Sequence, residues 1–125
     1  MERVILSHAD LNVFQNAFNR AVEIHEFSKK FPSEEKYSLT DQIRRSSRSV
    51  AANLAEAFRK RRYPKSFISK LTDSEGEAAE TQVWLRFAYT FNYLNEEEFK
   101  NLNSEYSHIL SQIVKMIRNP DKWSF

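Results

Sequence analysis

Apolar residues recur along this chain at alternating spacings of three and four, the period of an amphipathic helix. Four such stripes follow one another and are, in chain order: Leu11, Phe14, Phe18, Ala21 and His25; Ile43, Ser47, Val50, Leu54 and Phe58; Phe67, Leu71, Ser74, Ala78 and Leu85; Phe99, Leu102, Tyr106, Ile109, Ile113 and Met116. The stripes predict helices at residues 10–31, 39–62, 64–94 and 95–118, followed by a tail at 119–125.

Helix-breaking residues stand between the stripes and hardly anywhere else. Pro32, Pro64 and Pro120 are the three prolines of the chain, and Asn95 is a good N-cap for a helix whose first turn carries three glutamates. Since short connections make neighbouring helices antiparallel, the pattern predicts an all-α, up-down-up-down four-helix bundle. A length of 125 residues with one glycine suits a single domain that spans residues 1–125.

The second half of the third predicted helix is apolar around most of its circumference. Val83, Phe87 and Phe91 point away from the core stripe of that helix, and Gly76 lies on the same outer side. An exposed apolar patch of this size is typical of an interaction surface, which favours self-association. The alternative is that the loop near Pro32, or the tail with its two aromatic residues, folds over the patch.

Charge is distributed unevenly along the chain. The segment 44–70 has nine Lys or Arg and one acid, a net charge of +8, so the rest of the chain carries −6 and the whole carries +2. Two interpretations of this basic segment stay open. It binds the phosphates of a nucleic acid, or its arginines form ion pairs with the acidic residues of the third and fourth helices, within one chain or between two.

The two interpretations use different residues. For a nucleic-acid site the candidates are Arg59, Lys60, Arg61, Arg62 and Lys65. For a subunit interface the candidates are Arg44, Arg45, Arg48, Gly76, Glu80, Val83, Phe87 and Phe91. Serine and alanine separate the first three arginines, and such small side chains let another helix come close.

Several classes of function lack the residues that they need. The chain has no cysteine, and its single glycine cannot build a phosphate-binding loop. Glu105 and His108 form one E-x-x-H pair, but a di-iron site needs a second pair and two more inward glutamates. We therefore expect no enzyme, no cofactor and no metal. No signal peptide or membrane span is evident, so we expect a cytoplasmic protein without a membrane partner.

Two short signatures resemble a known family. They are Gln42, Ile43, Arg44, Arg45, Ser49, Asn53, Ala55 and Glu56 in the second helix, and Gly76, Ala79, Glu80 and Thr81 in the third. Together they resemble the bacterial four-helix-bundle proteins named after intervening sequences of 23S rRNA genes, and the resemblance extends from about Leu11 to Ile117. One departure is Ala57, where the family usually has glycine.

The resemblance implies a homopentameric ring and no catalytic residues. Accessory proteins of diversity-generating retroelements look similar in fold and bind nucleic acid and a reverse transcriptase through a basic surface, which is an analogy of fold alone. The expected partners are other copies of this chain and RNA or DNA. The alternative is an adaptor that holds another protein, through a groove or through the tail with Trp123 and Phe125, and binds no nucleic acid.

Overall fold

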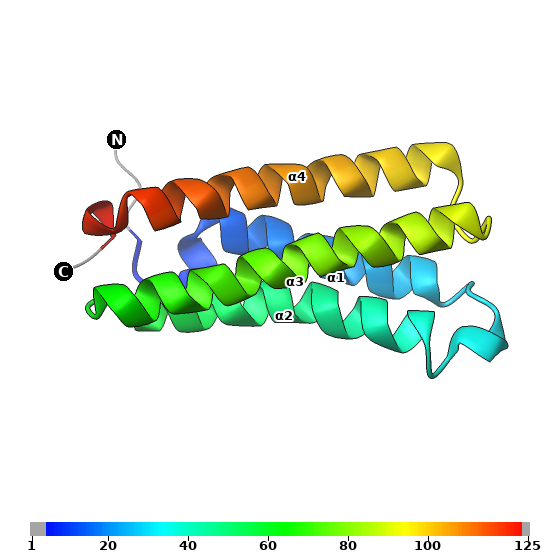
Figure 1. The fold of residues 1–125 in the computed structure, drawn as a ribbon, viewed down its shortest axis with the longest axis horizontal. Helices are drawn as coiled ribbons and strands as arrows, with labels where there is room; N and C mark the ends of the chain where they lie inside the picture. Colours follow the sequence, from blue (N-terminus) through cyan, green and yellow to red (C-terminus); the bar gives the residue numbers. More distant parts are fainter. Residues whose placement is uncertain (1–4, 124–125) are drawn as a thin grey trace.

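The computed structural model describes residues 5–123 and contains four long helices (Figure 1). They are α1 (Asn12–Ser28), α2 (Leu39–Arg59), α3 (Pro64–Thr90) and α4 (Glu96–Arg118). Three short 3-10 helices accompany them: η1 (His8–Asp10), η2 (Ser33–Glu35) and η3 (Pro120–Lys122). No strand occurs within the described residues, and the predicted all-α fold of four helices is confirmed.

The helices lie side by side along one long axis (Figure 1). α2 packs against α1 and α3, and α4 packs against α3 and α1. The chain turns back at each connection in Figure 1, so that the α2–α3 turn lies at the same end as η1 and η3. The α1–α2 and α3–α4 connections lie at the opposite end. The two ends of the bundle are therefore built from different segments.

The predicted core positions of α2, α3 and α4 are confirmed. Every residue of the α2 and α3 stripes is buried, and so are five of the six residues in the α4 stripe, from Leu102 to Met116. Phe99 is partly buried and packs against the core. The spacing of these residues puts their side chains on one face of each helix, which is the face that the bundle covers.

The predicted stripe of α1 is right only at its start, where Leu11 is buried and Phe14 packs against the core. The buried residues of this helix are Val13, Ala17, Ile24 and Ser28, whereas Phe18 keeps 53% of its surface exposed. Both sets have helical spacing, and the prediction favoured the set with the larger aromatic side chains. Ala17 is completely buried, which indicates that α1 turns its smaller side chains toward the core.

Three helices end earlier than their patterns predict. α2 ends at Arg59 rather than at residue 62, and residues 60–62 form a turn. α3 ends at Thr90 rather than at residue 94, and Asn92 then adopts a positive φ of 64°. A left-handed asparagine is a common way to leave a helix. α1 likewise spans residues 12–28 instead of 10–31.

Small polar side chains are buried where α2 packs against α3. Ser46, Ser74 and Thr81 are completely buried. The Ser74 hydroxyl donates to the Val50 carbonyl at 2.8 Å, and the Thr81 and Ser46 hydroxyl oxygens lie 2.8 Å apart. Buried hydroxyls need such partners, because an unpaired one costs free energy. Part of the serine content of the second helix thus serves packing within one bundle.

Tyr106 of α4 is a buried polar group of another kind. Its side chain has no exposed surface, and its hydroxyl has no hydrogen-bond partner among the described residues. Burial raises the pKa of the phenol well above its ordinary range. The hydroxyl therefore adds volume to the core while losing its hydrogen bonds to water.

We expect the Tyr106→Phe variant to be as stable as the natural chain at neutral pH, or more stable by about 1 kcal/mol, because it removes an unpaired hydroxyl. The sign of the pH dependence follows from the raised pKa. Above pH about 10 the unfolded tyrosine loses its proton while the folded one keeps it, so alkali favours unfolding. Urea unfolding at pH 8 and at pH about 10.5 should show that the variant's advantage in stability over the natural chain grows with pH. A variant less stable than the natural chain at both pH values would contradict this.

Candidate functional site

The most concentrated positive charge lies where α2 passes into α3. We call this segment the basic turn; it comprises Arg59, Lys60, Arg61, Arg62 and Lys65. Arg59, Lys60, Arg62 and Lys65 are exposed, and Arg61 is half-buried. Arg59, Lys60 and Lys65 form no ion pair with any described residue. The structure thus places all five predicted nucleic-acid residues together at one end of the bundle.

Arg61 has a structural role within the basic turn. Its guanidinium lies 3.7 Å from the centre of the Phe58 ring and donates to the Phe58 carbonyl at 2.8 Å. Burial, together with repulsion from Arg59 and Arg62, lowers the pKa of Arg61. A cation stacked on an aromatic face is partly withdrawn from solvent. The neighbouring exposed cations are therefore better placed to meet a ligand.

The three arginines of the first half of α2 are engaged within the chain. Arg44 Nε donates to Ser28 Oγ at 2.7 Å, and Arg48 Nη2 lies 3.1 Å from His25 Nδ1. Arg45 reaches α3, where it meets Glu77 and Glu80.

The Arg45 guanidinium contacts Glu77 at 2.9 Å and Glu80 at 2.7 Å. The hydrogen bond to Glu80 is the main cause that raises the pKa of Arg45. Lys70 in turn lies 2.9 Å from Glu56, and this contact lowers the pKa of Glu56. The interpretation that arginines of this segment pair with acids of the third helix therefore holds for Arg45, whereas Lys70 of α3 pairs with Glu56 of α2.

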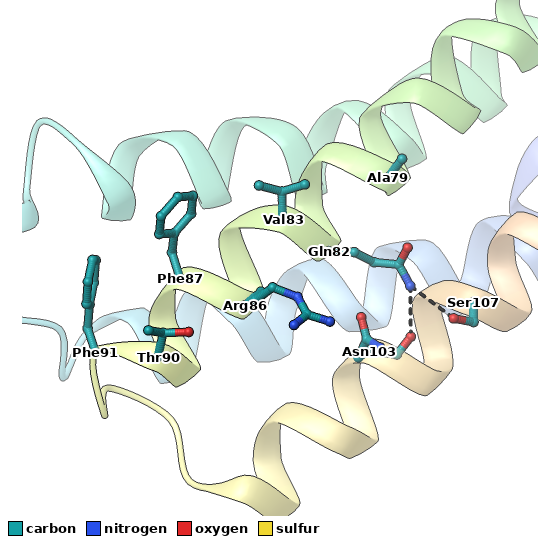
Figure 2. A pocket seen from close by; sticks show the side chains of 9 residues that line it. All are labelled: Ala79, Gln82, Val83, Arg86, Phe87, Thr90, Phe91, Asn103 and Ser107. Carbon is teal, nitrogen blue, oxygen red and sulfur yellow. Dashed lines mark hydrogen bonds between the residues drawn. The ribbon is translucent and has the colours of Figure 1, made fainter.

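A row of exposed apolar side chains follows the outer side of α3 (Figure 2). We call Val83, Phe87 and Phe91 the α3 ridge; they keep 50%, 44% and 49% of their surface exposed. The rings of Phe87 and Phe91 lie next to each other, with centres 5.9 Å apart and planes tilted by 36°. The described residues leave about half of each ridge side chain exposed, and Phe125 of the tail lies outside the described residues. The predicted outer position of all three side chains is confirmed.

The ridge borders a groove of about 650 Å³ between α3 and α4. On its α4 side the Gln82 amide donates to the Asn103 carbonyl at 3.1 Å and to Ser107 Oγ at 3.0 Å (Figure 2). Arg86 points across the groove toward α4 in the same view. One wall of the groove is therefore apolar and the other polar.

Gly76 lies on the same helix, two turns before the ridge. Apart from its chain neighbours and the nearby backbone of its own helix, no atom of the described residues lies within 4 Å of the place where a Cβ would stand. Around it is a shallow depression bordered by Asp73, Glu77 and Glu80. The predicted close approach of a backbone at Gly76 is thus not made within one chain.

A second apolar surface lies between α1 and α2, and sequence reasoning missed it. Phe18 and Val22 are 53% and 49% exposed, and with Phe14, Ala52 and Ala55 they line a groove of about 580 Å³. Phe14, Phe18 and Val22 are spaced by four residues, and this spacing could have revealed an outward stripe. The wrong assignment of the α1 core concealed it.

Other predicted features have ordinary surroundings. Glu105 lies 3.6 Å from Arg20, and His108 is exposed. Within residues 5–123 no three His, Asp or Glu side chains are grouped to hold a metal ion. None of the helices there is long and apolar enough to cross a membrane. Trp123 is half-buried and packs against the core.

Comparisons with known proteins place this geometry in context. The sequence model of a family described as 23S rRNA-intervening sequence protein matches residues 9–115. A solved structure from Bacteroides thetaiotaomicron, described as a protein with unknown function from the S23 ribosomal protein family, is similar in fold with a TM-score of 0.77. It is 29% identical, and the match covers 85% of this chain and 95% of that one. Among curated proteins none matches.

Proposed function

The chain belongs to the 23S rRNA-intervening sequence protein family, and from this premise we propose that it is a non-enzymatic, self-associating protein that binds RNA or DNA through the basic turn. The proposed bundle is antiparallel, up-down-up-down, and assembles into a homopentameric ring. The reversal of the chain at each connection in Figure 1 supports the antiparallel arrangement.

One observation carries the nucleic-acid proposal: three exposed cations of the basic segment that form no ion pair within the described residues lie together in the basic turn. Arg45 and Lys70 are neutralised by carboxylates of the same chain. Arg59, Lys60 and Lys65 are exposed and form no ion pair within the described residues. Non-specific nucleic-acid binding requires exposed Lys and Arg side chains, which neutralise phosphates and so release counterions from the nucleic acid.

The charge also differs between the two ends of the bundle. The last turn of α4 adds Lys115 and Arg118 at the end that holds the basic turn, whereas α4 begins at the other end with Glu96, Glu97 and Glu98. In a cyclic ring all subunits have the same orientation relative to the symmetry axis, so a ring would bring several copies of the basic turn into equivalent positions around it. When one nucleic-acid strand contacts several weak sites of a ring at once, the apparent affinity of the ring for that strand rises strongly.

Two different apolar surfaces support the ring. The α3 ridge and the α1–α2 groove lie on different helices of the bundle. A head-to-tail contact that joins two different faces of the same chain closes into a ring when the rotation allows it. A single apolar surface would favour a symmetric dimer instead.

Replacing Arg59, Lys60 and Lys65 together by alanine is expected to weaken binding to RNA and duplex DNA. Three lost phosphate contacts should reduce the slope of log K against log salt by about two to three. Fluorescence anisotropy with labelled oligonucleotides between about 50 and 200 mM salt measures both quantities. Arg61 stays unchanged because it packs on Phe58.

The matched control changes Lys29, Lys30 and Lys36 to alanine at the opposite end of the bundle, with the same loss of charge. This variant should retain the affinity and the salt slope of the natural chain. Equal weakening in both variants, or no binding by the natural chain at low salt, would refute a role for the basic turn.

A further inference from the structure

Tyr63 stands in the middle of the basic turn with its ring in solvent. Its side chain is 61% exposed, and no ring contact or hydrogen bond of that side chain occurs within the described residues. The backbone is fixed on both sides, because Tyr63 N–H donates to the Lys60 carbonyl at 2.9 Å and the Tyr63 carbonyl accepts from Phe67 N–H at 2.9 Å. A rigid turn therefore presents an unoccupied aromatic face.

The neighbouring aromatic residues behave differently. Phe58 and Phe67 are 3% and 1% exposed, and the Arg61 guanidinium covers the Phe58 ring. These two rings complete the core at this end of the bundle. Tyr63 contributes nothing to that core, so its position is free to serve a ligand.

Cations flank the Tyr63 ring in the sequence. Arg59 and Lys60 precede it by four and three residues, and Lys65 follows it by two. Proteins that bind single-stranded nucleic acids combine a positively charged surface with exposed aromatic rings. The phosphates contact the cations, and a base stacks on the ring. In a duplex the faces of the bases are stacked on one another and are not available.

We propose that Tyr63 stacks on an unpaired base, so that the basic turn selects single-stranded RNA or DNA over a duplex. The inference rests on the proposed function and narrows its ligand. Stacking on one aromatic side chain corresponds to about tenfold in affinity. The contact carries no charge, so it should leave the salt dependence unchanged, unlike the contacts of Arg59, Lys60 and Lys65.

The test measures anisotropy of a labelled unstructured strand of about 12 nucleotides and of a duplex of the same length, at about 50 mM salt. The natural chain should bind the single strand more tightly. Tyr63→Ala should weaken single-strand binding about tenfold and duplex binding by less than about twofold, with the same salt slope. Tyr63→Phe keeps the ring and should bind as the natural chain does.

Two controls isolate the stacking contact. Tyr37→Ala removes a ring that is 85% exposed in the α1–α2 connection. It should change neither the affinity for the single strand nor the affinity for the duplex. A strand of the same length with abasic sugars keeps its phosphates but has no base to stack. The natural chain and Tyr63→Ala should bind this strand equally.

The outcomes separate the inference from the proposed function. Equal affinity for single strand and duplex, with no effect of Tyr63→Ala, would overturn the stacking contact and leave binding by the basic turn intact. A loss in Tyr63→Ala that persists on the abasic strand would also overturn it. Absence of binding to either nucleic acid would overturn both proposals.

Discussion

Replacing Phe87 by glutamate is expected to dissociate the proposed ring into monomers. Phe87 is the central residue of the α3 ridge, and 44% of its surface is exposed in the single chain. An interface formed there would enclose the glutamate among apolar side chains, and burying an unpaired carboxylate costs several kcal/mol. Gel filtration with light scattering at about 10 µM would show the change in mass.

The matched control is Tyr37→Glu, which introduces the same charge at a ring that is 85% exposed in the α1–α2 connection. It should assemble as the natural chain does. Circular dichroism should show both variants folded, because neither side chain belongs to the core. A Phe87→Glu protein with the mass of the natural assembly would exclude the ridge from the subunit interface.

A change on the α1–α2 groove tests whether two different faces meet. Phe18→Glu should also give a monomer, because Phe18 lines the groove and is 53% exposed. When the two monomeric variants are mixed, each keeps one intact face, so a pair of one chain of each kind should form. A symmetric contact between two ridges would leave Phe18→Glu assembled.

Replacing Phe67 by alanine is expected to destabilise the fold by about 3 to 5 kcal/mol. Phe67 is 1% exposed and lies in the first turns of α3, inside the end of the bundle that carries the basic turn. Removal of the ring leaves a cavity that the surrounding helices fill only in part. Since a domain is stable by about 5 to 15 kcal/mol, this is a large fraction of its stability.

Thermal and urea unfolding measure this loss, and the melting temperature should fall by about 10 °C or more. Tyr63→Ala is the matched control, because it removes an aromatic ring four residues earlier that is 61% exposed. Its stability should change by less than about 0.5 kcal/mol. Equal losses in the two variants would contradict the assignment of Phe67 to the core and Tyr63 to the surface.

The number of helices and most of the core could be predicted from the sequence because α2, α3 and α4 each have one dominant apolar stripe. α1 has two stripes, and periodicity cannot choose between them. The structure buries Ala17 and Ile24 and leaves Phe18 half in solvent. Size and hydrophobicity favoured the aromatic stripe, but the close approach of neighbouring helices favours small side chains on the buried face.

Helix ends were less predictable for a local reason. Basic residues at the end of a helix are compatible with its dipole, so nothing in Lys60, Arg61 and Arg62 signals that α2 stops at Arg59. Asn92 is a clearer signal, since asparagine adopts the left-handed backbone more readily than most residues do. Its φ of 64° follows the end of α3.

The sequence separated Arg44, Arg45 and Arg48 from the basic turn, but it could not assign their partners. Arg45 contacts carboxylates that lie 32 and 35 residues later in the chain. Whether such contacts form depends on the rotation of each helix about its own axis. The stacking of Arg61 on Phe58 is local, with a spacing of three residues, and could have been foreseen. The exposed Tyr63 required the structure.

The molar mass of the natural chain in solution tests the central claim most directly. Light scattering after gel filtration at micromolar concentration should give about 74 kDa, five times the 14.8 kDa of one chain. The value should persist on dilution within the micromolar range. A mass of 14.8 kDa across that range would contradict a ring built on the exposed α3 ridge.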